Sequence, residues 1–217
     1  MPQATTDPFP VGGELPIAIQ ILIERKGLDP SAVTAREAIR GLLGFGARLE
    51  ALRRRRILEL ALLPAEGGDV VADLERYFDR TVVLWNSNKE RMWVRGAGLR
   101  TPWGGEFSHG TTRPGPFGHP PLDRPDRDHL MVWPRDTQGA PEDLAVALAP
   151  HRLLGVGAAE LWTVEWSDAC AEEERQTRIV QVGPIRTRTE GLLANPHYQD
   201  HRIFVGAVPL PLWGGAL

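Results

Sequence analysis

The sequence contains only one cysteine, Cys170, among its 217 residues. A single thiol excludes an internal disulfide and any zinc or iron–sulfur site built from several cysteines. Long hydrophobic runs are also lacking, because the stretches around 15–23 and 57–63 are much shorter than the ~20 residues that span a bilayer. The N-terminus has neither the basic start nor the apolar core of a secretory signal. These absences predict a cytoplasmic protein with no membrane partner.

Charge of either sign is not in large excess, since the formal net charge is −3. A general nucleic-acid binder is therefore disfavoured, although a local basic patch remains compatible with this charge. The glycine-rich motifs that hold nucleotide phosphates and the serine elbow of α/β-hydrolases do not occur. We expect no cofactor.

The composition is that of an ordinary globular protein, with 42% hydrophobic and 24% charged residues. Residues 1–13 are rich in proline and glycine, which predicts an extended N-terminal arm. We expect residues 14–217 to form a single α+β domain, with a helical part over 14–80 and a mixed β-sheet with one crossover helix over 81–217. No internal repeat is apparent in the sequence.

The helical part is predicted from spacing and capping signals. Apolar residues in 14–26 allow a helix or a strand, and a helix is favoured. Thr34 and Glu37 fit a capping box, and the apolar spacing that follows predicts helix up to Pro64, interrupted near 44–46 by glycines. Asp69 is expected to cap a further helix through Phe78.

The sheet part begins with a predicted hairpin, in which strands 81–85 and 91–95 flank a turn at 86–89. Further strands are predicted at 129–133, 161–166, 177–182 and 202–207. A helix is expected to start at Pro141, because proline is favoured in the first turn. This helix and the strands on either side of it could form a right-handed βαβ unit if those strands are parallel.

Residues 96–128 form a long irregular insertion rich in glycine and proline. Structureless loops longer than about 12–15 residues are uncommon in compact domains and often carry function. Trp103, Phe107 and Phe117 are its aromatic anchors and our predicted partner-binding residues. The insertion could be an ordered arm on a neighbouring subunit, a lid over a small-molecule site, or a disordered surface segment.

A second set of candidates combines basic and aromatic side chains that could contact phosphates and bases. On a helix, four successive arginines would spread around most of the circumference, so a basic solvated flank is the competing interpretation. The predicted nucleic-acid-binding residues are Arg53, Arg54, Arg55, Arg56, Trp85, Lys89, Arg91, Trp93 and Arg95.

Histidines and aspartates offer a third set of candidates, as ligands for a metal ion. The spacing matches no metal motif, so no metal site is expected, and the competing interpretations are an alternating-charge run and an Asn-Pro turn before the last strand. The candidate ligands are His109, His119, Asp128, His129, His197 and His201.

The favoured function is a non-enzymatic subunit or adaptor of a multi-protein assembly, which uses the arm and the insertion as contact surfaces. One alternative is a subunit of a nucleic-acid-handling complex. The other is a metal-dependent hydrolase.

Overall fold

The computed structural model describes residues 16–97, 104–107, 122, 124–135, 141–187 and 190–210. The elements in chain order are β1 (Ile17–Arg25), α1 (Pro30–Leu42), the 3₁₀ turn η1 (Gly46–Arg48), β2 (Leu49–Leu63), α2 (Val70–Arg80), β3 (Glu90–Ala97), β4 (Gly104–Phe107), β5 (Asp128–Pro134), α3 (Glu142–Ala147), β6 (Arg152–Trp166), α4 (Glu172–Val182) and β7 (Gln199–Val205). The predicted arm at 1–13 lies outside the described residues.

Within the described residues, seven strands form one sheet with the order β4-β3-β1-β2-β6-β5-β7. Every neighbouring pair runs antiparallel. Apolar residues of α1, α2, α3 and α4 pack on one face of the sheet, which we call the helix face, and the opposite face is the back face. The predicted α+β class is confirmed, whereas a mixed sheet with a parallel crossover is wrong because β5 and β6 are antiparallel neighbours.

The predicted helical region over 14–80 is wrong, because β1 and β2 lie within it. Residues 49–63 form the central strand β2, in which Ile57 and Leu58 are both buried although they point to opposite faces. A strand buried on both faces reads as a nearly continuous apolar run, and this pattern cannot be told from a buried helix by spacing alone. Helix is confined here to α1 and α2 and the η1 turn.

Of the two helix starts predicted from capping residues, one is confirmed and one is wrong. Asp69 caps α2 as expected, and its side chain accepts a hydrogen bond from the Ala72 amide at 3.0 Å. The capping box at Thr34 is wrong, because α1 begins one turn earlier, where Asp29 accepts from the Ser31 amide at 3.0 Å and Pro30 occupies the first turn. An Asx cap followed by proline is a sufficient start signal on its own.

The sheet part contains both confirmed and wrong predictions. β5, β7, the end of β6 and the helix after Pro141 lie where the sequence placed them. The predicted strand at 177–182 is helix α4, whose acidic first turn complements the helix dipole. The predicted hairpin is also wrong, because 81–85 is irregular and β3 pairs with β1 and β4 instead.

The predicted irregular insertion at 96–128 is not supported where the structure describes it. β3 extends to Ala97, and β4 pairs with it through residues 104–107, with Met92 and Phe107 as backbone partners. Leu122 is buried on the back face, and β5 begins at Asp128. Residues 98–103, 108–121 and 123 lie outside the described part of the chain.

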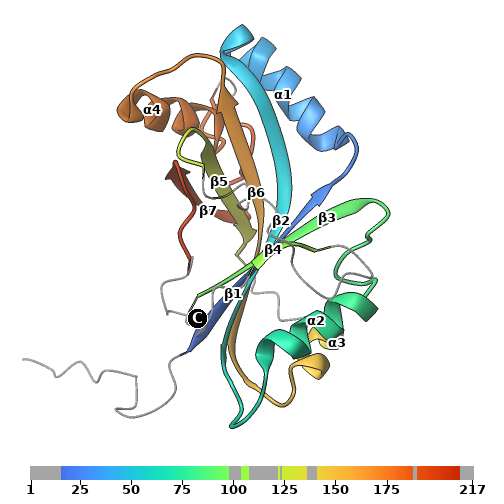
Figure 1. The fold of residues 1–217 in the computed structure, drawn as a ribbon. Helices are drawn as coiled ribbons and strands as arrows, with labels where there is room; N and C mark the ends of the chain where they lie inside the picture. The colour runs from blue at the N-terminus through green and yellow to red at the C-terminus, as the bar shows by residue number, and fades with distance from the viewer. Residues whose placement is uncertain are drawn as a thin grey trace, which may run out of the picture.

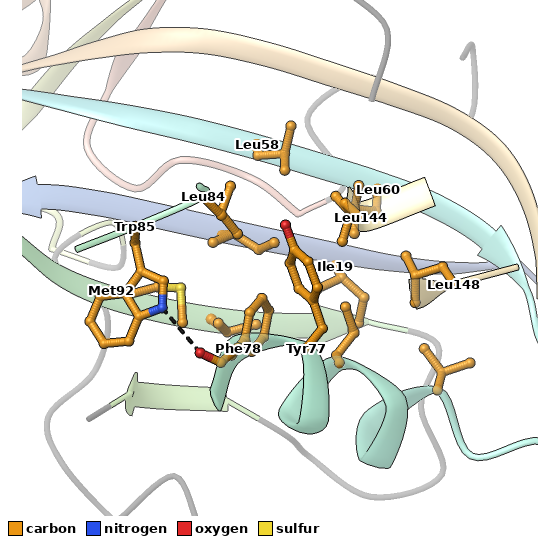
Figure 2. Packing of buried hydrophobic residues seen from close by; sticks show 14 of the residues in the cluster. Ile19, Leu58, Leu60, Tyr77, Phe78, Leu84, Trp85, Met92, Leu144 and Leu148 are labelled. Carbon is orange, nitrogen blue, oxygen red and sulfur yellow. Dashed lines mark hydrogen bonds between the residues drawn. The ribbon is translucent and has the colours of Figure 1, made fainter. Parts of the chain in front are cut away.

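Two apolar cores lie on the helix face, one at each end of the sheet (Figure 1). The first core is built on β1, β3 and the end of β2, and α2 and α3 cover it; Figure 2 shows Tyr77 and Phe78 of α2 beside Leu144 of α3. The second core is built mainly on β5 and the end of β6, and α1 and α4 cover it. A third cluster, which includes Leu22, Trp93 and Leu161, lies on the back face.

The two halves of the chain repeat the same order of elements. β1-α1-β2-α2-β3 corresponds to β5-α3-β6-α4-β7; β2 and β6 each have 15 residues, and α2 and α4 each have 11. Read outward from the central β2–β6 pair, the strand order is the same in both directions as far as β3 and β7. The order of the elements therefore defines an approximate internal two-fold axis, although α1 has 13 residues and α3 has six and the sequence shows no repeat.

The strand register obeys the same relation. Ile21 pairs with Leu58 and Val94, and its counterpart Leu130 pairs with Trp162 and Ile203. Each long strand also carries a β-bulge near its start. Because Leu58 corresponds to Trp162, Arg56 two residues earlier corresponds to Glu160. Arg56 and Glu160 are also direct partners in the β2–β6 ladder, so the axis passes between these two residues.

Candidate binding groove

The four successive arginines of β2 are divided between the two faces of the sheet, because side chains of a strand alternate. Arg54 and Arg56 lie on the helix face, whereas Arg53 and Arg55 lie on the back face. The expectation that these arginines spread around a helix is wrong for this reason. The helix face therefore receives two arginines at the internal two-fold axis.

A groove of about 410 Å³ crosses the helix face at this axis. It exists because α1 and α4 cover one end of the sheet and α2 and α3 cover the other (Figure 1), which leaves the middle of β2 and β6 without a helix. Side chains from β1, β2 and β6, the start of α1 and the segment between α2 and β3 line the groove. They include Ile23, Arg25, Asp29, Arg54, Arg56, Val82, Val83, Asn86, Glu90 and Glu160.

The carboxylates of the groove are already engaged by its two central arginines. Arg54 Nε donates to Asp29 Oδ2 at 2.9 Å, and its Nη1 donates to Glu160 Oε1 at 3.2 Å. Arg56 Nη2 lies 3.1 Å from Glu90 Oε1. Burial alone would raise the pKa of Asp29, but the hydrogen bond and charge of Arg54 outweigh it and lower that pKa. The groove therefore presents cations rather than a carboxylate ready to accept a proton.

A second hollow of about 410 Å³ continues the groove past Arg25 and along the turn after β1. Arg25, Lys26 and Lys89 line it, and among the described residues none of the three has a carboxylate within ion-pair distance. The Lys26 amide donates to the Lys89 carbonyl oxygen at 2.8 Å, which joins the two segments that carry these cations. A chain of net negative charge thus has a local excess of positive charge along the groove.

Exposed apolar side chains border the same groove. Leu28 is 85% exposed, Val82 is 77% exposed and Val83 is 69% exposed. These residues were not singled out from the sequence, because Val82 and Val83 precede two apolar residues that are buried, Leu84 and Trp85, and the run reads as one strand. Only the irregular backbone of 81–85 explains why Val82 and Val83 are exposed while Leu84 and Trp85 are buried.

The predicted nucleic-acid-binding residues do not form one surface. Trp85 and Trp93 are 3% and 8% exposed, so neither ring is presented for base stacking, and Trp85 donates its indole N–H to the Phe78 carbonyl (Figure 2). Arg53, Arg91 and Arg95 belong to the back face by strand alternation. Of the set, Arg54, Arg55, Arg56 and Trp85 line the groove and Lys89 lines its continuation, but Arg55 and Trp85 are each only 3% exposed.

The back face contains a buried polar network. Arg55 donates to Glu24 Oε2 at 2.9 Å and to Thr163 Oγ1 at 2.6 Å, and His129 Nδ1 lies 3.1 Å from the same hydroxyl. His129 Nε2 has no hydrogen-bond partner among the described residues. Burial, followed by the positive charges of Arg55 and Arg127, lowers the pKa of His129 to about 3.

A second polar network on the back face holds the segment that follows β7. Arg95 Nε donates to Gln20 Oε1 at 2.8 Å, and its Nη2 donates to the Val208 carbonyl at 2.7 Å. Gln20 Nε2 donates to Glu59 at 2.5 Å and to the Pro209 carbonyl at 3.0 Å. Gln20 and Arg95 therefore fix this segment across the sheet.

The predicted metal ligands are separated where the structure describes them. Asp128 points to the helix face, where its oxygens accept from Arg175 and the Trp166 indole, while its neighbour His129 points to the back face. His197 lies in a turn that leads into β7, and His201 is exposed on that strand, as the Asn-Pro turn interpretation predicts. The described residues contain no group of three His, Cys, Asp or Glu side chains that could hold a metal ion. His109 and His119 lie outside the described residues.

The predicted partner-binding anchors are mostly outside the part of the chain that the structure describes. This applies to Trp103 and Phe117, and Phe107 is placed only as the last residue of β4. In the described parts of the chain, every helix falls short of the length and apolarity needed to cross a bilayer. Comparison of the chain with protein-family models, with curated proteins and with solved structures finds no match.

Proposed function

We propose that the chain is a non-enzymatic binding subunit that holds an acidic segment of a partner protein in the groove at its internal two-fold axis. The proposal rests on three cations that have no carboxylate partner among the described residues, Arg25, Lys26 and Lys89. They lie along the same groove as the exposed apolar side chains of Leu28, Val82 and Val83. A segment with carboxylates and apolar side chains would satisfy both.

The apolar border favours a protein segment over nucleic acid. A phosphate backbone would contact the cations but would leave Leu28, Val82 and Val83 in water. Trp85 lines the groove but is only 3% exposed, too little for its ring to stack on a base. Apolar side chains of a peptide would remove these three residues from water instead. The adaptor function predicted from the sequence is kept here, with the groove as its contact surface.

The proposal is tested by selecting random displayed peptides on the immobilised chain. Selected peptides should combine Asp or Glu with Leu, Val or Phe. One of them, synthesised and labelled, should lose affinity by about tenfold or more for the variant Arg25→Glu/Lys89→Glu, since two attractive charge contacts become repulsive. Arg48→Glu, which reverses an exposed arginine outside the groove, is the matched control and should bind like the unmodified chain.

Three outcomes would contradict the proposal. Selected peptides without acidic residues would exclude charge recognition, and equal binding to the groove variant and the control would place the site elsewhere. Binding of a single-stranded oligonucleotide that Arg25→Glu/Lys89→Glu abolishes, without any peptide selected, would support the nucleic-acid alternative.

A further inference from the structure

The internal two-fold axis leaves one position of the sheet without a counterpart. The outer edge of β3 is covered by β4, which pairs with residues 92–95. β7 corresponds to β3 in the second half, and among the described residues no strand covers its outer edge. Backbone groups on such an edge are available to pair with another strand.

The side chains of β7 are also only partly covered. Ile203 and Val205 are half-buried against the second core on the helix face, and Phe204 is half-buried against the back-face cluster. Just before the strand, Tyr198 is 73% exposed. A further strand beside β7 would complete the cover on both faces.

We propose that β7 forms the interface of a symmetric homodimer, in which the β7 strands of two copies pair antiparallel and join their sheets. This proposal is independent of the groove and of its ligand. An isologous pair of identical edge strands is the simplest closed assembly that satisfies both edges at once.

The charges of β7 select one register for this pairing. Asp200 and Arg202 lie on the back face, two residues apart, by alternation with Phe204. If either of them lay on the dimer axis, it would face its own copy, a like-charge contact. If His201 lies on the axis, Asp200 of each copy faces Arg202 of the partner subunit, so the dimer contains two pairs of opposite charge.

The same register pairs the apolar side chains. Tyr198 lies in the turn immediately before β7, where the Arg135 amide donates to its carbonyl oxygen at 3.2 Å, and in this register it would lie opposite Phe204 of the partner subunit. Aromatic cross-strand pairs of this kind stabilise antiparallel sheets. Charged side chains usually discourage edge pairing. Here the Asp200 and Arg202 pair of one copy is complementary in charge to the same pair in the second copy.

The experiment is a charge reversal read out by sedimentation velocity over the micromolar range. The unmodified chain should dimerise. Asp200→Arg and Arg202→Asp should each raise the dimer dissociation constant about tenfold or more, since each puts like charges opposite one another twice. An equimolar mixture of the two variants should dimerise again, because opposite charges then face each other in both pairs.

Arg135→Ala is the matched control, because Arg135 forms an ion pair with Asp200 within the chain at 3.3 Å. Loss of that pair alone should leave dimerisation unchanged. A monomeric unmodified chain would overturn the proposal without any variant. So would single variants that dimerise normally, or folded variants, checked by circular dichroism, whose mixture stays monomeric.

Discussion

His129 occupies a position that few titratable side chains tolerate. It is fully buried, lies within hydrogen-bond distance of the Thr163 hydroxyl and faces the positive charge of Arg55. Both burial and the nearby guanidinium groups disfavour its protonated form, so its pKa falls to about 3. The imidazole is neutral in the folded protein throughout the physiological range.

This shift predicts that His129 makes the chain less stable in acid. The unfolded chain binds a proton at the ordinary histidine pKa of about 6.5, whereas the folded chain does not until about pH 3. The unfolded state therefore holds more protons in this window, and stability is lost as the pH falls through it, by up to ~1.4 kcal/mol per pH unit. Urea unfolding at several pH values should show a shallower pH dependence for His129→Gln than for the unmodified chain. His197→Gln, at an exposed turn, should change nothing, and parallel curves for all three would refute the burial argument.

Sequence identified some cations of the groove but not their grouping, and it missed Arg25 and Lys26. Arg54, Arg56 and Lys89 were singled out, yet with Arg53 and Arg55, which point to the other face. Strand alternation divides this run, and alternation could not be applied while 49–63 was expected to be a helix. The topology alone brings Val82 to the groove and Leu28 to its continuation, and no local signal marks either of them.

At the scale of elements, α3 shows how a short helix depends on tertiary packing. It has six residues, too few for an isolated helix to be stable in water. Leu144 is fully buried in the first core, beside Tyr77 and Leu60 in Figure 2, while Val146 on the same helix is 69% exposed. Asp143 also accepts a hydrogen bond from the Tyr77 hydroxyl at 2.8 Å.

Leu144→Ala should therefore destabilise the protein by about 2–5 kcal/mol, the usual cost of removing a buried leucine side chain. Val146→Ala should change the free energy of unfolding by less than about 0.5 kcal/mol, as is common at exposed sites. Urea denaturation followed by circular dichroism measures both. Equal effects of the two substitutions would mean that α3 does not pack as described.

The elements that sequence predicted correctly carry their own signals. Asp69 marks the start of α2, Pro141 marks α3, and β5 and β7 are short runs of strand formers that begin and end in turns. β2 and α4 were missed because their identity depends on surroundings. β2 is buried on both faces, and the apolar residues of α4 near Ile179 fit a short strand as well as one helical face.

At the scale of the whole molecule, the two halves exchange helices. α1 joins β1 to β2 in the first half but packs in the second core, and α3 joins β5 to β6 in the second half but packs in the first core. β2 and β6 run through both cores. Neither half can therefore complete its core alone, and the two cores should unfold together.

Leu60→Ala in the first core and Leu49→Ala in the second test this coupling, because both leucines are fully buried. Each should shift one shared unfolding transition by about 2–5 kcal/mol. Tryptophan fluorescence and far-ultraviolet circular dichroism should give coincident midpoints for every variant, as two-state unfolding requires. Two separate transitions, only one of which moves with each substitution, would show that the cores are independent.

Arg56 and Glu160, which pair at the centre of β2 and β6, show which residues a fold with an internal two-fold axis can place on that axis. In a dimer of identical chains, a residue on the symmetry axis meets its own copy, so a charge placed there repels itself. Within one chain the two positions are encoded separately, and here they are Arg56 and Glu160, of opposite sign. Covalent connection of the halves thus permits an asymmetric, charged centre that exact symmetry forbids, and this centre is where the groove lies.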